Sequence, residues 1–160
     1  MTMTTHREAQ IVADPDVPIV RITREFDAPV EKVYRAHVDP DLVAQWMGPD
    51  SLQVRIDQWD ARTGGSWRYV ATRDDDEFGF RGCFHELRPD ELIVQTFTWE
   101  GMPDGVALEK CQFEDLGAGR SRLTATSLVD SFEARDAFLA SGMETGVVEG
   151  YERLDALLAD

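Results

Sequence analysis

The stretch from Asp130 to Asp160 constrains the fold most strongly, because it carries a long apolar stripe at helical spacing. Ser131 suits the position before the first turn of a helix, where its hydroxyl can accept a backbone hydrogen bond. The apolar residues that then recur at helical spacing are Phe138, Met143, Val147, Tyr151, Leu154 and Leu158. We therefore expect one long C-terminal helix.

A second stripe in this stretch consists of Gly142, Gly146 and Gly150, each four residues from the last. Glycine inside a helix costs roughly 1 kcal/mol relative to alanine, so three in register need a reason. Close packing or a local bend is one explanation, and space left for a bound molecule is the other. Acidic residues such as Glu144 and Glu149 interleave the stripe, which excludes a membrane dimerisation motif.

The charge of the chain restricts its partners. The formal net charge is −15 over 160 residues, which disfavours nucleic acid and anionic membrane surfaces. A hydrophobic content of 42% is typical of a soluble protein with a real core. Cys83 and Cys111 have no paired spacing and lie in apolar runs, as reduced core cysteines do. No stretch resembles a signal peptide or a membrane span, so we expect a cytoplasmic protein.

Residues 1–18 lack periodicity and predict a loose N-terminal tail. Residues 19–26 alternate between apolar and polar and predict a first strand. Two short helices should follow, one from Pro29 to Val38 and one over residues 41–46.

Alternating runs joined by hairpin-length turns dominate the middle of the chain. They predict six further strands, at about 52–57, 66–71, 78–87, 92–99, 106–114 and 120–128. Such a succession indicates an antiparallel meander. The sequence thus predicts an α+β protein with a seven-stranded curved antiparallel sheet around a long C-terminal helix, forming a single domain over residues 19–160.

Four segments of the chain resemble a known family: Arg24–Pro49 (REFDAPVEKVYRAHVDPDLVAQWMGP), Gly64–Tyr69 (GGSWRY), Phe80–Trp99 (FRGCFHELRPDELIVQTFTW) and Ser141–Leu158 (SGMETGVVEGYERLDALL). They are similar to the heat-shock-protein ATPase activator homologue family of the START and birch-pollen-allergen-like (SRPBCC) superfamily. The resemblance implies a helix-grip fold with an internal cavity. Relatives bind lipids, hormones or polyketides, a few catalyse cyclisation or hydration, and the namesakes activate a chaperone ATPase in the stress response.

Residues suited to catalysis are scarce. The histidines are His6, His37 and His85, and only His85 shares a strand face with a cysteine, Cys83. Residues two apart on a strand lie roughly 7 Å apart at Cα, which is loose for a nucleophile and its base. His37 has a simpler explanation as a charge at a helix C-terminus. No zinc spacing, phosphate loop or nucleophile elbow is present. We therefore predict no catalytic residue, no metal and no cofactor.

Aromatic side chains that alternate onto the same face of each strand form most of the predicted ligand site. The rings are Trp46, Trp67, Tyr69, Phe80, Phe84, Phe97, Trp99 and Phe113, and the helix wall is Phe138, Met143, Val147 and Tyr151. Arg81, His85, Gln95 or Glu109 would orient the ligand. Most of these rings could equally fill a core. If the face with Arg81 and His85 pointed inward, an acidic ligand would become credible.

The predicted function is binding of a small, largely apolar, aromatic, lipid-like or polyketide-like molecule between sheet and helix. A cyclase or hydratase using the same cavity is the first alternative, and it needs an acid or base beside the ligand. A chaperone-ATPase activator module is the second. Monomer and homodimer are both left open.

Overall fold

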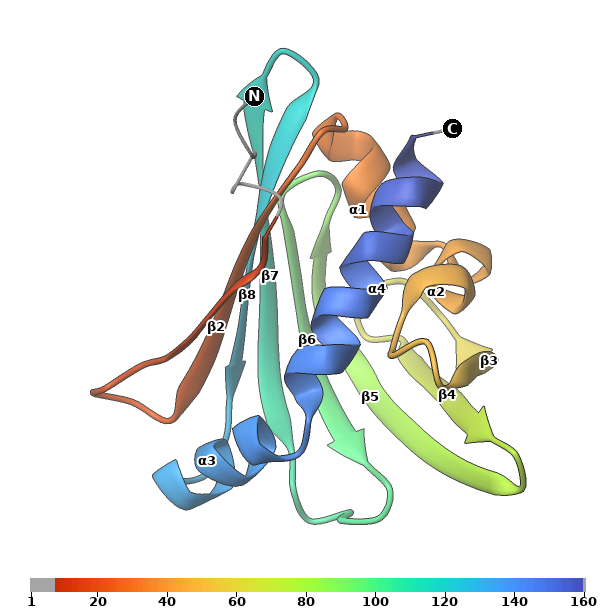
Figure 1. Ribbon diagram of the computed structural model, residues 1–160, viewed down its shortest axis with the longest axis vertical. Coiled ribbons are helices and arrows are strands. Elements are labelled where there is room, and N and C mark those ends of the chain that lie inside the picture. The colour runs from red at the N-terminus through yellow and green to blue at the C-terminus, as the bar shows by residue number, and fades with distance from the viewer. Residues whose placement is uncertain (1–7, 160) are drawn as a thin grey trace.

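The structure, a computed structural model, describes residues 8–159. The strands are β1 (Gln10–Ala13), β2 (Ile19–Phe26), β3 (Gln53–Trp59), β4 (Ser66–Arg73), β5 (Asp76–Arg88), β6 (Leu92–Trp99), β7 (Ala107–Gly117) and β8 (Arg120–Leu128). The helices are α1 (Val30–Val38), α2 (Pro40–Trp46), α3 (Phe132–Ala140) and α4 (Met143–Leu158). All strands belong to one antiparallel sheet in the order β1-β2-β8-β7-β6-β5-β4-β3, and α4 crosses its concave face (Figure 1). The α+β class and the curved sheet around a C-terminal helix are confirmed.

The sheet has eight strands where the sequence predicted seven. The extra strand, β1, lies within the segment expected to be a loose tail, and it pairs with β2 from Gln10↔Thr23 to Ala13↔Val20. It covers four residues at the edge of the sheet and buries none of them fully. A short exposed edge strand needs no apolar alternation, so the sequence carried no sign of it. Residues 1–7, including His6, lie outside the described part.

The connection from β2 to β3 forms the two predicted helices. The Asp39 backbone N–H caps α1 by donating to the Arg35 carbonyl, and the Asp39 carboxylate caps α2 by accepting from the Asp41 N–H at 3.0 Å. Pro40 at the first position of α2 has no N–H to leave unpaired. This shared cap turns the chain so that Trp46, at the end of α2, faces the interior.

The C-terminal stretch is two helices and not one long helix. Ser131 caps α3 as predicted, accepting from the Ala134 N–H at 3.1 Å, but the helix ends at Ala140. Gly142 then adopts φ +89°, a left-handed conformation that favours glycine, and α4 starts after it. The bend falls within the five-residue step from Phe138 to Met143, the one step of the apolar stripe that is longer than four residues.

The other two glycines of the stripe allow α4 to lie close to the end of α2. A Cβ on Gly150 would lie 3.0 Å from the Trp46 carbonyl oxygen, and one on Gly146 would lie 3.4 Å from Cδ of Pro49. Arg153, one turn along α4, donates to the carbonyl oxygens of Trp46 and Gly48. The bend therefore explains Gly142 and close helix packing explains Gly150, whereas Gly146 packs on Pro49 and also lines the cavity between the sheet and the helices.

The bend at Gly142 gives a test of this geometry. We expect Gly142→Ala to lower the free energy of unfolding by about 1–2 kcal/mol, because a Cβ disfavours the left-handed conformation. A continuous helix would instead predict a gain of roughly 1 kcal/mol. Urea unfolding followed by circular dichroism measures the sign. Gly142→Asn is the control and should lose less, since asparagine tolerates this conformation better.

Candidate functional site

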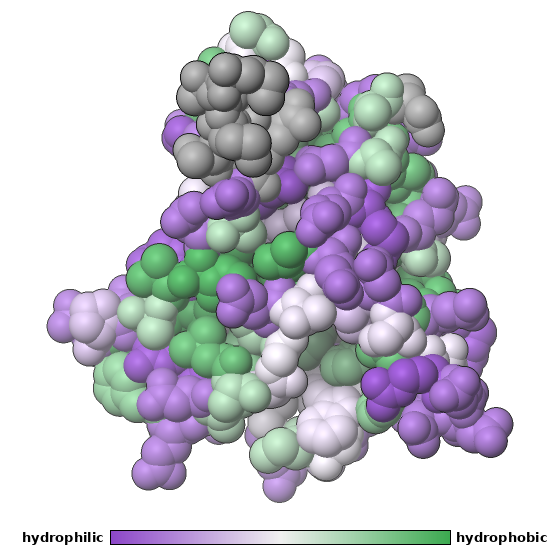
Figure 2. Space-filling view, viewed as in Figure 1, coloured by the Kyte–Doolittle hydropathy of each residue, from purple (hydrophilic) through white to green (hydrophobic). Residues whose placement is uncertain are grey.

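A cavity of about 300 Å³ lies between the concave face of the sheet and the helices. Residues from α1, α2, α3 and α4 line one side, and residues from β2, β3, β4, β6, β7 and β8 line the other. Figure 2, in the same view as Figure 1, shows a recess among pale and apolar residues near the first turns of α4. Its volume is at the low end of the roughly 300–1,000 Å³ typical of small-molecule pockets.

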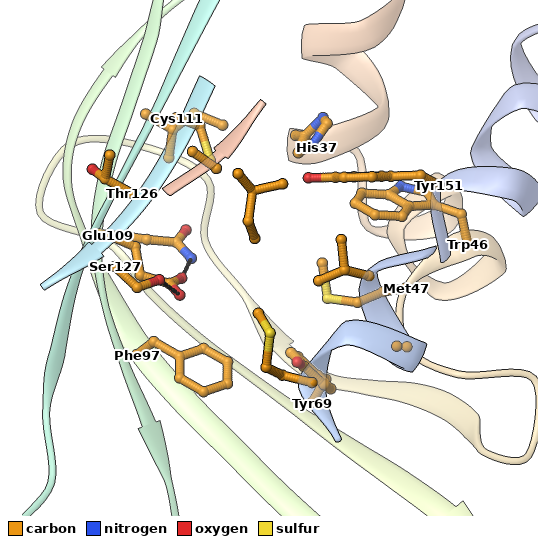
Figure 3. Close-up of a pocket in the computed structure, with 18 of the residues that line it drawn as sticks. His37, Trp46, Met47, Tyr69, Phe97, Glu109, Cys111, Thr126, Ser127 and Tyr151 are labelled. Atoms are coloured by element: carbon orange, nitrogen blue, oxygen red, sulfur yellow. Dashed lines mark hydrogen bonds between the residues drawn. The ribbon is translucent and has the colours of Figure 1, made fainter. Parts of the chain in front are cut away.

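The sheet wall contains a row of three polar side chains. Gln95 on β6, Glu109 on β7 and Ser127 on β8 are direct neighbours across the ladder, so their side chains share the concave face. Gln95 Nε2 donates to Glu109 Oε1 at 3.0 Å, and Ser127 Oγ donates to Glu109 Oε2 at 2.9 Å. Figure 3 shows this row facing Met47 and Tyr151 across the cavity. The carboxyl group is thus held in a defined orientation at the cavity wall.

Burial raises the pKa of the Glu109 carboxyl, and the two hydrogen bonds from Gln95 and Ser127 oppose that shift without cancelling it. A carboxyl with a raised folded-state pKa stabilises the fold fully below its unfolded-state pKa, and this contribution is lost as pH rises through the folded-state value.

This titration predicts how Glu109→Gln changes stability with pH. Because the variant cannot ionise there, its free energy of unfolding should rise relative to wild type as pH increases from 5 to 8. Chemical unfolding of both proteins at each pH measures the difference between their free energies of unfolding. The other titrating groups are the same in both proteins, so their contributions cancel in this difference. A difference that stays constant over this range would contradict the raised pKa.

Aromatic rings form the rest of the sheet wall. Trp67 and Tyr69 on β4 are stacked with ring centroids 5.5 Å apart, and Phe97 lies 5.9 Å from Trp67. Trp59 on β3 reaches over Trp67 and is anchored by its indole N–H, which donates to the Val38 carbonyl at 2.8 Å. Interlocked rings of this kind make a rigid apolar surface.

The helix wall is built around Trp46 and Tyr151. Their rings are stacked at 5.9 Å, and the Trp46 indole N–H donates to the Ala36 carbonyl at 2.8 Å. Figure 3 shows Tyr151 directed from α4 toward the sheet, with its hydroxyl in the cavity. Phe138 from α3 and Met143 and Val147 from α4 complete this wall.

His37 also lines the cavity, although the sequence indicated only a charged helix-capping role. Its ring is packed against Trp46 and Phe113, at 4.9 and 5.2 Å. Burial lowers the pKa of His37 to about 4, so the ring is neutral at neutral pH. Nδ1 lies 2.7 Å from the Val33 carbonyl, which only accepts, so Nδ1 carries the proton and Nε2 is an acceptor. The charged-cap explanation is therefore wrong.

The structure brings ten of the sixteen predicted site residues to the cavity. They are Trp46, Trp67, Tyr69, Gln95, Phe97, Glu109, Phe138, Met143, Val147 and Tyr151. Several further lining residues were missed, among them Ile22, Met47, Trp59, Ala125 and Ser127. Ala125 and Ser127 lie two and four residues after Leu123 on β8, so all three side chains share one face of the strand. This alternation could have predicted that Ala125 and Ser127 face inward with Leu123.

Three of the six remaining predicted residues belong to the core. Phe84 and Phe113 are buried among other side chains, so they support the site without lining it. Phe80 stacks on Tyr69 at 5.2 Å, which places it behind that ring.

The other three lie away from the cavity. Arg81 and His85 are exposed on the convex face, and Arg81 lies 3.7 Å from Glu100. Trp99 is 42% exposed and packs on the turn at Gly101, at the far end of β6. Because Arg81 and His85 point outward, the acidic ligand considered from the sequence loses its support.

Metal-binding clusters and membrane-spanning helices are both absent from the described residues 8–159. No group of three or more His, Cys, Asp or Glu side chains there is arranged to hold a metal ion. No helix within that range is both long and apolar enough to cross a bilayer.

A model of the family described as "Activator of Hsp90 ATPase homolog 1-like protein" matches residues 27–159. The chain belongs to this family. The family is part of the SRPBCC superfamily, and the resemblance drawn from the four sequence segments is confirmed. A search of curated proteins finds no match.

Solved structures of the same fold come from several bacteria. A protein from Arthrobacter aurescens is 25% identical with a TM-score of 0.85, covering 94% of this chain and 91% of its own. One from Rhodobacter sphaeroides is 26% identical with a TM-score of 0.83, covering 95% and 98%. Protein Ms6760 from Mycobacterium smegmatis is 24% identical with a TM-score of 0.84, covering 94% and 97%. These similarities confirm the helix-grip fold of the Activator of Hsp90 ATPase homolog 1-like family.

Proposed function

We propose that this protein binds a small, largely apolar molecule with an aromatic or lipid-like body in the cavity between the sheet and α4. The observation that carries the proposal is a cavity of about 300 Å³ whose walls are mostly aromatic and aliphatic and include one hydrogen-bonded carboxyl row. An apolar surface supplies affinity and a few placed polar groups supply orientation, which is the usual composition of a ligand site. A cytoplasmic location is part of this proposal and rests on the unpaired cysteines.

The energetics are sufficient for useful affinity. Burying one apolar side-chain equivalent contributes roughly 1.5–3 kcal/mol, and micromolar binding corresponds to about 8 kcal/mol. A ligand must therefore make several such contacts, counting the apolar surface that it covers on the cavity walls, to reach micromolar affinity after the cost of association.

The test is a screen of a library of aromatic and aliphatic small molecules by thermal shift, with native mass spectrometry of the protein purified without denaturation. At least one compound class should raise the melting temperature in a dose-dependent way. A screen with no shift and no co-purified molecule would overturn the proposal.

An enzyme of the cyclase or hydratase type is a second candidate, favoured by two groups in the cavity. Glu109 has a raised pKa, which suits a general acid, and neutral His37 offers Nε2 as a general base. Turnover of a bound compound that Glu109→Gln abolishes without loss of binding would favour this candidate.

A chaperone contact is the third candidate, and the family description suggests it. Leu108 and Leu128 are cross-strand neighbours that are 36% and 37% exposed, a small apolar pair on the outer face. Stimulation of an Hsp90-type ATPase, reduced by Leu108→Ser, would support such a contact.

A further inference from the structure

Within the described residues, the cavity wall contains a group that can be negatively charged but no positively charged group. Among its lining residues in the described part of the chain, Glu109 is the one carboxylic acid, and neither lysine nor arginine is present. His37 carries no charge at neutral pH. Arg24, a buried cation near Tyr151, is paired with Asp155 by two hydrogen bonds of 2.8 and 2.6 Å and does not line the cavity. An ionised Glu109 therefore has no positive partner within the cavity.

The two donors to Glu109 leave it able to accept more. Gln95 bonds one oxygen and Ser127 the other, and each carboxylate oxygen has two acceptor sites. Both donors are neutral, so they orient the carboxylate without neutralising it. A desolvated charge without a counter-ion is costly, and a cationic ligand would remove that cost.

The aromatic walls favour the same sign of charge. Ring faces attract cations, and the Phe, Tyr and Trp rings that line the cavity are Trp46, Trp59, Trp67, Tyr69, Phe97, Phe138 and Tyr151. The net charge of −15 adds a field that draws cations toward the protein and repels anions.

We propose that the cavity selects an apolar molecule that carries a protonated amine, with its ammonium group against the Glu109 carboxylate and its apolar body against the rings. The proposal rests on the proposed binding function and names its ligand class. An apolar carboxylic acid of the same shape is excluded, because its charge would face Glu109 with no cation to offset it.

Three probes with one indole-ethyl body test the proposal: tryptamine, the neutral alcohol tryptophol and indole-3-propionate. Isothermal titration calorimetry at pH 7.5 should give tryptamine an affinity at least about tenfold above that of tryptophol, as expected for one charge-assisted hydrogen bond. Indole-3-propionate should bind more weakly than either.

Glu109→Gln is the diagnostic variant, and Glu114→Gln is its control. Glu114 is on the same strand, its side chain is 59% exposed and pairs with Arg122, and its replacement changes the net charge equally. Tryptamine should lose about tenfold or more in affinity with Glu109→Gln and keep its affinity with Glu114→Gln. Tryptophol should change by less than about twofold in both.

The pH dependence gives a second readout. The other titratable groups that line the cavity with Glu109 are Tyr69 on β4, Cys111 on β7, Tyr151 on α4 and His37 on α1. Burial raises the pKa of both tyrosines and of Cys111, the last to about 12, and His37 is neutral above about 4. These groups keep their charge state between pH 5 and 8, and burial raises the pKa of Glu109, so tryptamine affinity should fall as the pH is lowered and Glu109 is protonated.

Equal affinities for the three probes, a preference for indole-3-propionate, or no effect of Glu109→Gln would each overturn the amine selectivity. If tryptophol binds and tryptamine does not, the binding function stands and only its ligand class is wrong. If none of the three binds, this inference fails, and the library screen above decides whether the binding function fails with it.

Discussion

Replacing Ala125 with leucine is expected to abolish ligand binding while the protein remains folded. Ala125 lies in the middle of the sheet wall, paired with Ile22 on β2 and Cys111 on β7, and all three line the cavity. A leucine there extends into a space of about 300 Å³ that one small ligand would fill. Binding should weaken by more than tenfold, because an overpacked site costs about 1–3 kcal/mol.

The measurement is calorimetric titration with the best compound from the thermal-shift screen, together with urea unfolding. Stability should be unchanged or raised by up to about 2 kcal/mol, since the new side chain fills empty apolar space. Thr124→Leu is the control, because Thr124 is the adjacent residue on β8 and is absent from the cavity wall. Unchanged affinity with Ala125→Leu would mean that the ligand binds elsewhere on the protein.

Replacing Leu154 with alanine is expected to lower the free energy of unfolding by about 2–5 kcal/mol. Leu154 is 0% exposed, the lowest exposure among the buried residues of α4, and it belongs to the hydrophobic core cluster. Loss of its methyl groups leaves a void beneath the helix that the rigid aromatic surroundings fill poorly. For a protein whose total stability is about 5–15 kcal/mol, this is a large fraction.

Val148→Ala serves as the matched control, since Val148 is on the same helix and is 38% exposed. Its effect should stay within about 0.5 kcal/mol. Chemical unfolding measured side by side would separate the two. A similar small loss for both variants would show that α4 contributes little to the core.

The local pattern of apolar, polar and turn residues was sufficient to predict most of the fold. The strand over residues 19–26 was predicted with its observed bounds, and the shared cap at Asp39 and Pro40 was visible as a helix break. Alternation also grouped Trp67 with Tyr69, and Gln95 with Phe97, on common strand faces, because side-chain direction in a strand has a period of two, and these faces line the cavity.

The errors arose where a pattern permits more than one answer. Cys83, Arg81 and His85 share a face, but alternation does not say which face is inside, and the burial of Phe84 decides it. The left-handed Gly142 lies in the five-residue step from Phe138 to Met143, and one such step is too weak a departure from helical spacing to separate a bend from a straight helix.

The amino-acid sequence by itself determined the order of strands and helices, the family and the parity of the inner rings, because those depend on neighbours along the chain. Only the tertiary structure decided that Glu109 meets Gln95 and Ser127, that His37 is neutral, and that the cations lie outside the cavity. The physical reason is that protonation and charge depend on burial and on partners from other strands and helices, and distant segments supply these only when the sheet closes around α4.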